Sequence, residues 1–257
     1  ALPLFQRAVE IDPKFAMAHA SLARLYSISE DPALAAESAR KAYELRDRAT
    51  DREKFFISAS YEIDVTGNLQ KARQTCEAWS QAYPRDAQVH GFLAGMIYPT
   101  FANYEKAVDE ARKAIEIDPD LAIAYEILAY NYQYLGRLDD AQDALRKASE
   151  RKLELPEYIV RQHDIAFLRA DQGGMERAAA LAKVNLAAEE WMADHEAFVL
   201  AYSGRLREAK TMLRRAVELG LRASVRERAA LYTIPAALWD ALFGNAPGAT
   251  QTAMEAG

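Results

Sequence analysis

The sequence predicts an all-α protein: an α-solenoid of about seven antiparallel helix pairs, preceded by one single helix. Three observations lead to this prediction. A triplet of mostly small apolar residues recurs along the 257-residue chain, a second apolar helix precedes most recurrences, and glycine or proline separates the helices. The composition agrees, since 51% of the residues are hydrophobic, 27% are charged, and glycine and proline are sparse.

The recurring triplet is an apolar residue, usually Ala, with partners four and seven residues later. This spacing places all three side chains on one face of a helix, and small side chains there let a neighbouring helix approach closely. Successive triplets start 31 to 40 residues apart, which suits a two-helix unit and is too long for a leucine-rich repeat. The triplets are Ala1/Phe5/Ala8, Ala35/Ala39/Ala42, Ala72/Cys76/Trp79, Ala107/Ala111/Ala114, Ala141/Leu145/Ala148, Ala178/Ala182/Asn185, Ala209/Leu213/Ala216 and Ala249/Ala253/Ala256.

The residues between the helices support the same division. Gly67, Gly136, Gly204 and Gly244 each stand five residues before a triplet, where glycine supplies the left-handed conformation that ends a helix. Asp31 and Pro32 replace this glycine in the first pair with an N-cap and a proline in the first helical turn. The predicted pairs span residues 16–49, 53–86, 87–120, 122–153, 157–187, 190–220 and 222–257. Pro99 and Pro235 fall inside apolar helical patterns and should kink or split those helices.

The residues of these pairs resemble the tetratricopeptide repeat family. The pattern is fullest in "AIAYEILAYNYQYLGRLDDAQDALRKA" (122–148), where eight signature positions match: Tyr125, Leu128, Ala129, Tyr132, Gly136, Ala141, Leu145 and Ala148. The resemblance implies a right-handed superhelix whose first helices line a concave, peptide-binding surface. The match weakens after residue 154, where Arg169 and Glu196 occupy positions that are usually apolar.

We therefore expect residues 1–257 to form a single solenoid, regular over 1–153 and divergent over 154–257. The opening "ALPLFQRAVEIDP" (1–13) is interpreted as the second helix of a truncated repeat, so the chain is expected to be a fragment of a longer protein. Three phrases resemble the C-terminal repeat regions of bacterial serine/threonine kinases of the eukaryotic type: "DREKFFISASYEIDVTGNLQKARQTCEAW" (51–79), "DIAFLRADQGGMERAAALA" (164–182) and "AALWDALFGNAPGA" (236–249). That resemblance implies a kinase domain ahead of the repeats, although the chain has no HRD or DFG motif of its own.

The sequence offers no catalytic, metal or cofactor site. His19, His90, His163 and His195 form no HExxH motif and are interpreted as structural. The acidic pairs at 139–140 and 189–190 diverge around their helices and cannot share a site. Cys76 occupies an inward position and is expected to be a buried spacer rather than a reactive thiol.

Charge favours protein partners over nucleic acid or an anionic membrane surface, because the net charge is −6. The uncharged stretch at residues 229–239 is too short to span a bilayer. Residues 205–228 carry a local charge of +5. We interpret them as a solvated face with pairs such as Glu208 with Arg205, with a contact site for nucleic acid or an acidic partner as the alternative. The cellular compartment stays open.

The resemblance assigns groove-facing positions on the first helices, and those chosen as candidate peptide contacts are Met17, Arg24, Lys54, Tyr61, Phe92, Met96, Glu126, Tyr130 and Tyr134. These types are common at interfaces, but they also fill gaps between neighbouring helices. The Lys/Asn pair that clamps a chaperone's C-terminal carboxylate in some family members is absent. The predicted function is a non-catalytic scaffold that binds a peptide or helix, with possible self-association through open repeat ends. Helical-repeat binding of nucleic acid and a structural or oligomerisation module are the alternatives.

Overall fold

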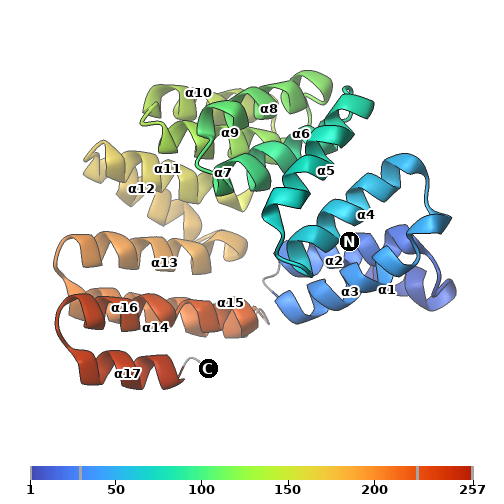
Figure 1. Cartoon of the computed structure of the whole chain (residues 1–257). Coiled ribbons are helices and arrows are strands. Elements are labelled where there is room, and N and C mark those ends of the chain that lie inside the picture. Colours follow the sequence, from blue (N-terminus) through green and yellow to red (C-terminus); the bar gives the residue numbers. More distant parts are fainter. Residues whose placement is uncertain (1, 29–30, 224–225, 256–257) are drawn as a thin grey trace. The chain divides into compact units, whose positions relative to one another are not determined.

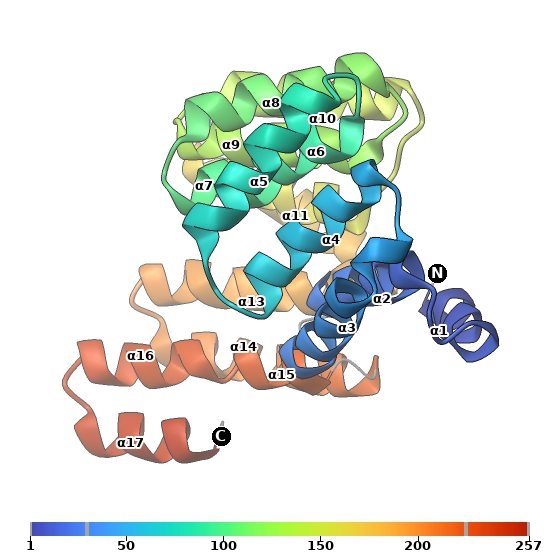
Figure 2. The ribbon, with the colours of Figure 1, turned by 45° about the vertical axis from the view of Figure 1, so that its right-hand side comes forward.

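The computed structural model describes residues 2–28, 31–223 and 226–255, and it divides into two compact units, Ala1–Leu153 and Glu154–Gly257. All regular structure in the described residues is helical, and within each unit consecutive helices pack side by side in pairs (Figures 1 and 2). This confirms the predicted all-α class of paired helices. The expectation of one continuous solenoid through residue 257 stays a prediction.

The first unit contains a single leading helix and four helix pairs. The leading helix is α1 (Leu2–Ile11), and the pairs are α2 (Ala16–Ile28) with α3 (Pro32–Glu44), α4 (Asp51–Asp64) with α5 (Leu69–Ala82), a composite first helix with α8 (Tyr104–Ile117), and α9 (Ala122–Tyr134) with α10 (Leu138–Glu150). A short 3-10 turn, η1 (Arg46–Arg48), precedes α4. The composite helix consists of α6 (Ala87–Phe92), the π-helical turn η2 (Leu93–Ile97) and α7 (Tyr98–Thr100).

The second unit contains three pairs, close to the predicted boundaries. These are α11 (Pro156–Leu168) with α12 (Gln172–Ala182), α13 (Leu186–Tyr202) with α14 (Leu206–Arg222), and a divided first helix, α15 (Arg226–Leu231) and α16 (Ile234–Leu242), with α17 (Ala246–Glu255). Pro235 lies in the first turn of α16, so the predicted split is confirmed. Ala1 and Ala256, the ends of the first and last triplets, lie outside the described residues.

The predicted turn residues adopt the expected conformations. Gly67, Gly136, Gly204 and Gly244 all have positive φ, between 64° and 83°, as helix-terminating glycines should. The side chain of Asp31 accepts a hydrogen bond from the Leu34 N–H and caps α3, as predicted.

The central triplets form the core of each unit. In α5, Ala72, Cys76 and Trp79 are fully buried, and they pack with Phe56 and Phe92 from neighbouring first helices. Burial raises the pKa of the Cys76 thiol to about 12, with the charge of Glu62 as a smaller cause, so the predicted role as a buried spacer is confirmed. In the second unit Leu213 and Trp239 belong to a separate core cluster.

Candidate functional site

The predicted contact residues lie on the first helices of the first unit, α2, α4, the composite helix and α9. Seven of them are half-buried: Met17, Arg24, Lys54, Tyr61, Met96, Glu126 and Tyr130. Tyr134 is 55% exposed, whereas Phe92 is only 6% exposed. We call this set of nine residues the groove face. Partial burial fixes the positions of side chains while leaving part of each accessible, which suits a recognition surface.

A cluster around Arg24 joins α2, α4 and the composite helix of the groove face. The guanidinium of Arg24 lies over the ring of Phe92, 5.3 Å from its centroid, at cation–π distance. Burial lowers the pKa of Arg24, and the nearby carboxylate of Asp64 acts in the opposite direction. Burial likewise raises the pKa of Asp64, opposed by Arg24 and by a hydrogen bond from Ser27. Phe92 therefore packs against the Arg24 guanidinium, and Arg24 and Asp64 place charges of opposite sign near each other.

Two aromatic stacks order the tyrosines of the groove face. Tyr61 stacks on Tyr43 of α3, with ring centroids 4.0 Å apart. On α9, Tyr130 and Tyr134 contact each other at 4.7 Å, and Tyr134 stacks on Tyr104 at 4.9 Å. Stacking restricts the rings, so less conformational entropy is lost when a ligand binds.

The π-helical turn η2 has a direct cause in the sequence. The Tyr98 N–H bonds to the Leu93 carbonyl, five residues back. In this register the Ala94 carbonyl would receive the N–H of residue 99, which is proline and has none. Asn131 of α9, fully buried, supplies the missing donor through its Nδ2, 3.1 Å from the Ala94 oxygen. The predicted distortion at Pro99 is thus confirmed, and it takes the form of a widened turn.

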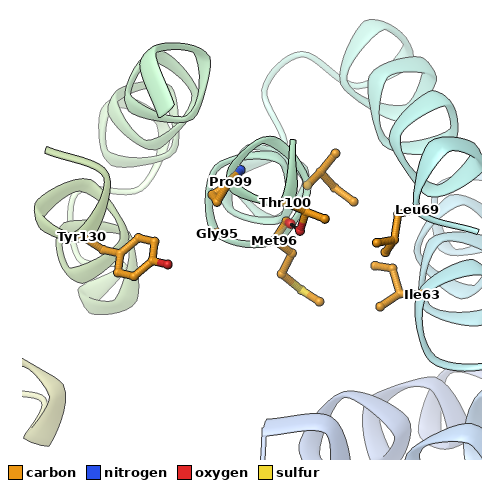
Figure 3. A pocket seen from close by; sticks show the side chains of 8 residues that line it. Ile63, Leu69, Gly95, Met96, Pro99, Thr100 and Tyr130 are labelled. Atoms are coloured by element: carbon orange, nitrogen blue, oxygen red, sulfur yellow. Dashed lines mark hydrogen bonds between the residues drawn. The ribbon is translucent and has the colours of Figure 1, made fainter. Parts of the chain in front are cut away.

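A cavity of about 350 Å³ opens beside this turn, and we call it the η2 pocket. Its lining residues are Ile63, Leu69, Gly95, Met96, Ile97, Pro99, Thr100 and Tyr130. Figure 3 shows Tyr130 on one side, Ile63 and Leu69 on the other, and Met96 between them. Of the predicted contact residues, the structure therefore brings Met96 and Tyr130 together around one cavity.

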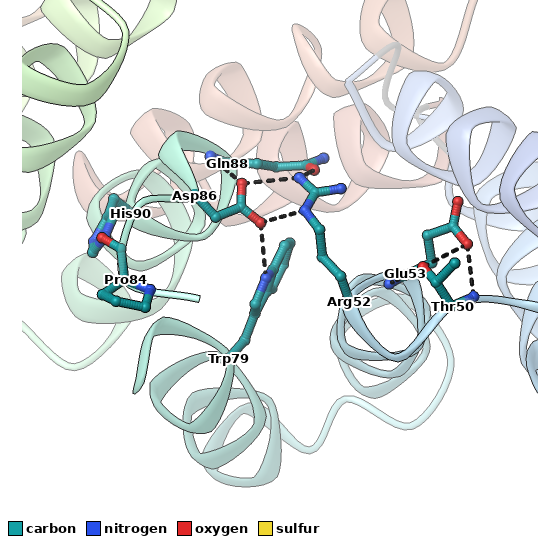
Figure 4. Close-up of polar contacts among 8 residues, drawn as sticks. All are labelled: Thr50, Arg52, Glu53, Trp79, Pro84, Asp86, Gln88 and His90. Carbon is teal, nitrogen blue, oxygen red and sulfur yellow. Dashed lines mark hydrogen bonds and ion pairs between the residues drawn. The ribbon is translucent and has the colours of Figure 1, made fainter. Parts of the chain in front are cut away.

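Asp86, the N-cap of α6 with a side chain only 9% exposed, fixes the composite helix to α4 and α5. Arg52 donates from Nε to Asp86 Oδ2 at 2.7 Å and from Nη2 to Asp86 Oδ1 at 2.9 Å, and the indole of Trp79 donates to Asp86 Oδ2 at 2.9 Å (Figure 4). Asp86 also accepts from the Gln88 N–H and so caps α6. Sequence reasoning missed this cluster, because Arg52 and Asp86 are 34 residues apart and neither belongs to the repeat signature.

His90 and His163 are buried and His19 and His195 are half-buried, and three contacts of histidines to carboxylates were not visible in the sequence. His90 is buried, with Nδ1 2.5 Å from Glu110 Oε2 and Nε2 3.0 Å from the Pro84 carbonyl oxygen. In the second unit, Asp164 lies 2.7 Å from His195 Nδ1 and 3.7 Å from His163 Nδ1. Within the described ranges, no three His, Cys, Asp or Glu side chains gather in a way that could hold a metal ion.

The second unit presents a counterpart face that sequence reasoning missed. Exposed apolar side chains occur at equivalent positions of α13 and α16: Phe198 (45%), Tyr202 (82%), Leu238 (56%) and Leu242 (71%). Phe198 and Tyr202 also make edge contacts with Trp239 and Phe167, respectively. The repeat register that selected Tyr130 and Tyr134 would have selected these residues, had it been continued past residue 154.

Several basic side chains of the stretch 205–228 form ion pairs with acidic side chains. Arg205 Nε donates to Glu208 Oε1 at 2.7 Å, as predicted, and Arg215 Nη2 donates to Glu189 Oε1 at 2.8 Å. Lys210 pairs with Asp240 at 2.5 Å, and Arg228 pairs with Glu190. These contacts favour the interpretation as a solvated, internally paired face. None of the described helices has the length and apolar character needed to cross a membrane.

Comparisons with known proteins agree with the fold. A family model described as "-like, C-terminal domain" matches residues 60–233. The structure is similar to that of a tetratricopeptide repeat protein from Parabacteroides merdae, at 15% identity and a TM-score of 0.56, covering 86% of this chain and 91% of that one. It is also similar to the human IFIT1 dimer with m7Gppp-AAAA (15% identity, TM-score 0.65, 98% and 66% covered) and to yeast Tom70 (17% identity, TM-score 0.60, 99% and 53% covered). No curated protein matches the sequence significantly.

Proposed function

Because the chain belongs to the family described as "-like, C-terminal domain" and has a tetratricopeptide-like fold, we propose that it is a non-catalytic scaffold for protein interaction. The groove face binds a peptide or helix of a partner protein. The observation that supports this proposal most is the gathering of partly exposed Arg, Met and Tyr side chains on the first helices. Arg and Tyr are enriched among residues that dominate binding energy, and Met adapts its shape to apolar ligands.

A displayed library of random peptides tests the proposal even though the partner is unidentified. Peptides selected on the parent chain should bind the triple variant Arg24→Ala, Tyr61→Ala, Tyr130→Ala at least about tenfold more weakly. The matched control is Arg40→Ala, Gln74→Ala, Asp109→Ala, three exposed residues on the second helices α3, α5 and α8. Peptides that bind the parent and both variants equally would contradict the groove face as the binding site and direct attention to the counterpart face on α13 and α16.

We further propose that the chain is the recruiting or sensing region of a bacterial signalling kinase. The support is the resemblance of residues 51–79, 164–182 and 236–249 to the repeat regions that follow such kinase domains, together with the description of the family as a C-terminal domain. The reading frame upstream of residue 1 tests this proposal. It should encode a glycine-rich loop followed by HRD and DFG motifs, and an upstream frame without them would contradict it.

Nucleic-acid binding is the second candidate function, because the structural neighbour IFIT1 was solved with m7Gppp-AAAA. The internal pairing of residues 205–228 and the net charge of −6 oppose it. Electrostatic binding of RNA should weaken steeply with salt. Titration with single-stranded RNA at two salt concentrations therefore separates the candidates, because a scaffold for protein partners should show little binding at either. Self-association is tested independently by light scattering during gel filtration.

A further inference from the structure

The η2 pocket differs from the rest of the groove face in the chemistry of its lining. Five apolar side chains surround it, those of Ile63, Leu69, Met96, Ile97 and Pro99. Thr100 and Tyr130 bring the only hydroxyl groups among the residues that line it, and no lining residue is charged. A volume of about 350 Å³ stands at the small end of the range for ligand pockets. The pocket therefore suits a side chain or a small molecule of similar size.

The backbone of η2 forms one wall of the pocket, and neighbouring residues hold this backbone in place. A Cβ at Gly95 would lie 2.9 Å from Ile127 Cδ1, so glycine permits η2 and α9 to approach each other closely. The widened turn itself is held by the bond from Asn131 Nδ2 to the Ala94 oxygen. Because Pro99 and Asn131 fix this geometry before any ligand arrives, the pocket is preorganised.

We propose that the η2 pocket receives one uncharged apolar side chain, of leucine or phenylalanine size, from the bound peptide. The inference rests on the proposed function and adds to it the class of side chain that is recognised. A charged side chain would lose its hydration in this pocket without gaining an ionic partner among the lining residues. An apolar side chain gains by leaving water and contacts the walls formed by Met96, Tyr130 and Leu69.

Methionine-methyl NMR tests the proposal on the whole chain. The chain has six methionines, of which Met96 lines the η2 pocket, while Met175 and Met212 line a different cavity in the second unit. Titration with N-acetyl-leucinamide should shift the Met96 signal saturably and leave the signals of Met175 and Met212 unchanged. N-acetyl-lysinamide should require at least about tenfold higher concentration for the same shift at Met96. Met96→Leu identifies the signal.

A blocking variant and a matched control complete the test. Leu69 and Leu138 are half-buried leucines at the first residue of α5 and α10, and only Leu69 lines the η2 pocket. Leu69→Phe should abolish the Met96 shift, and Leu138→Phe should preserve it. An equal response to both amides, or an unchanged response in Leu69→Phe, would overturn the proposal.

The peptide selection described above separates failure of this inference from failure of the proposed function. If selected peptides depend on the groove face but N-acetyl-leucinamide leaves Met96 unshifted, only the assignment of the η2 pocket is wrong. If the amide shifts Met96 as expected but no selected peptide depends on the groove face, the pocket does bind apolar groups and the proposed peptide-binding function is wrong. If both measurements fail, both proposals fall.

Discussion

At the scale of single residues, Asp86 makes the most informative contacts. Its carboxylate accepts hydrogen bonds from Arg52, from the buried indole of Trp79 and from the first turn of α6. Removing it leaves the Trp79 N–H buried without an acceptor, because Trp79 is fully buried. We expect Asp86→Ala to lower the free energy of unfolding by about 2 kcal/mol in urea denaturation.

Asp120→Ala is the matched control for that measurement. Asp120 also pairs with an arginine from another element, at 2.7 Å from Arg151 just after α10, and it too stands just before a first helix. The side chain of Asp120 is 74% exposed, against 9% for Asp86. Exposed pairs of this kind contribute less than about 1 kcal/mol. Equal losses in the two variants would show that the burial of Asp86 does not determine its contribution.

His90 and Glu110 give the first unit a defined dependence on pH. The hydrogen bond to Glu110 raises the pKa of His90, while burial and the charge of Lys113 oppose this rise. Burial would raise the pKa of Glu110, but the hydrogen bonds from His90 and Lys113 outweigh it and the net shift is downward. The stabilisation by His90 is complete below its ordinary pKa of 6.5 and is lost as pH rises through the raised value. That of Glu110 is complete above its ordinary pKa of 4.5 and is lost on acidification through the lowered value.

The pair should therefore stabilise the fold most between pH 4.5 and 6.5, the two ordinary values. We expect the melting temperature of the parent to fall more between about pH 6 and about pH 8.5 than that of His90→Gln. His19→Gln is the control, because His19 holds the equivalent repeat position and likewise contacts a proline carbonyl oxygen six residues earlier, at 3.0 Å from Pro13. If His19→Gln removed the pH dependence as fully as His90→Gln, the assignment to the His90–Glu110 pair would be wrong.

At the scale of elements, the π turn η2 couples two residues that are far apart in sequence. Asn131→Ala should lower the free energy of unfolding by about 2 kcal/mol, because the Ala94 carbonyl loses its donor inside the core. Pro99→Ala restores an N–H at the position that this register requires. In the Pro99→Ala background the same Asn131→Ala change should therefore cost about 1 kcal/mol less, as measured by a double-mutant cycle in urea. Additive losses would show that Asn131 and Pro99 act separately.

The same elements show what the sequence could and could not predict. The four positive-φ glycines, the split at Pro235 and the buried Cys76 depend on short spacings within one helix or turn, and all were predicted. Helix pairing was predicted from the recurrence of the triplet every 31 to 40 residues. The π register at Pro99 was predicted only as a distortion, because its form depends on a donor from Asn131, 37 residues from Ala94. The η2 pocket could not be predicted for the same reason, since its walls come from several helical elements. The assignment of peptide contacts on the groove face stays a prediction.

At the scale of the whole molecule, the two compact units have separate cores, and Cys76 gives a probe for one of them. The thiol is fully buried in the first unit with its pKa raised to about 12, so a disulfide reagent should label it only when that unit opens. In stacked helical repeats, stability is a sum of local terms and contacts between neighbouring units. Asp86→Ala should therefore raise the native-state labelling rate of Cys76 by at least about tenfold, since about 2 kcal/mol is lost close to the thiol.

Leu213→Ala removes a buried side chain from the core of the second unit and should cost at least as much stability overall. If stability is local, that variant should change the labelling rate by far less than Asp86→Ala does. Equal acceleration by the two substitutions would instead show that all 257 residues unfold as one cooperative unit.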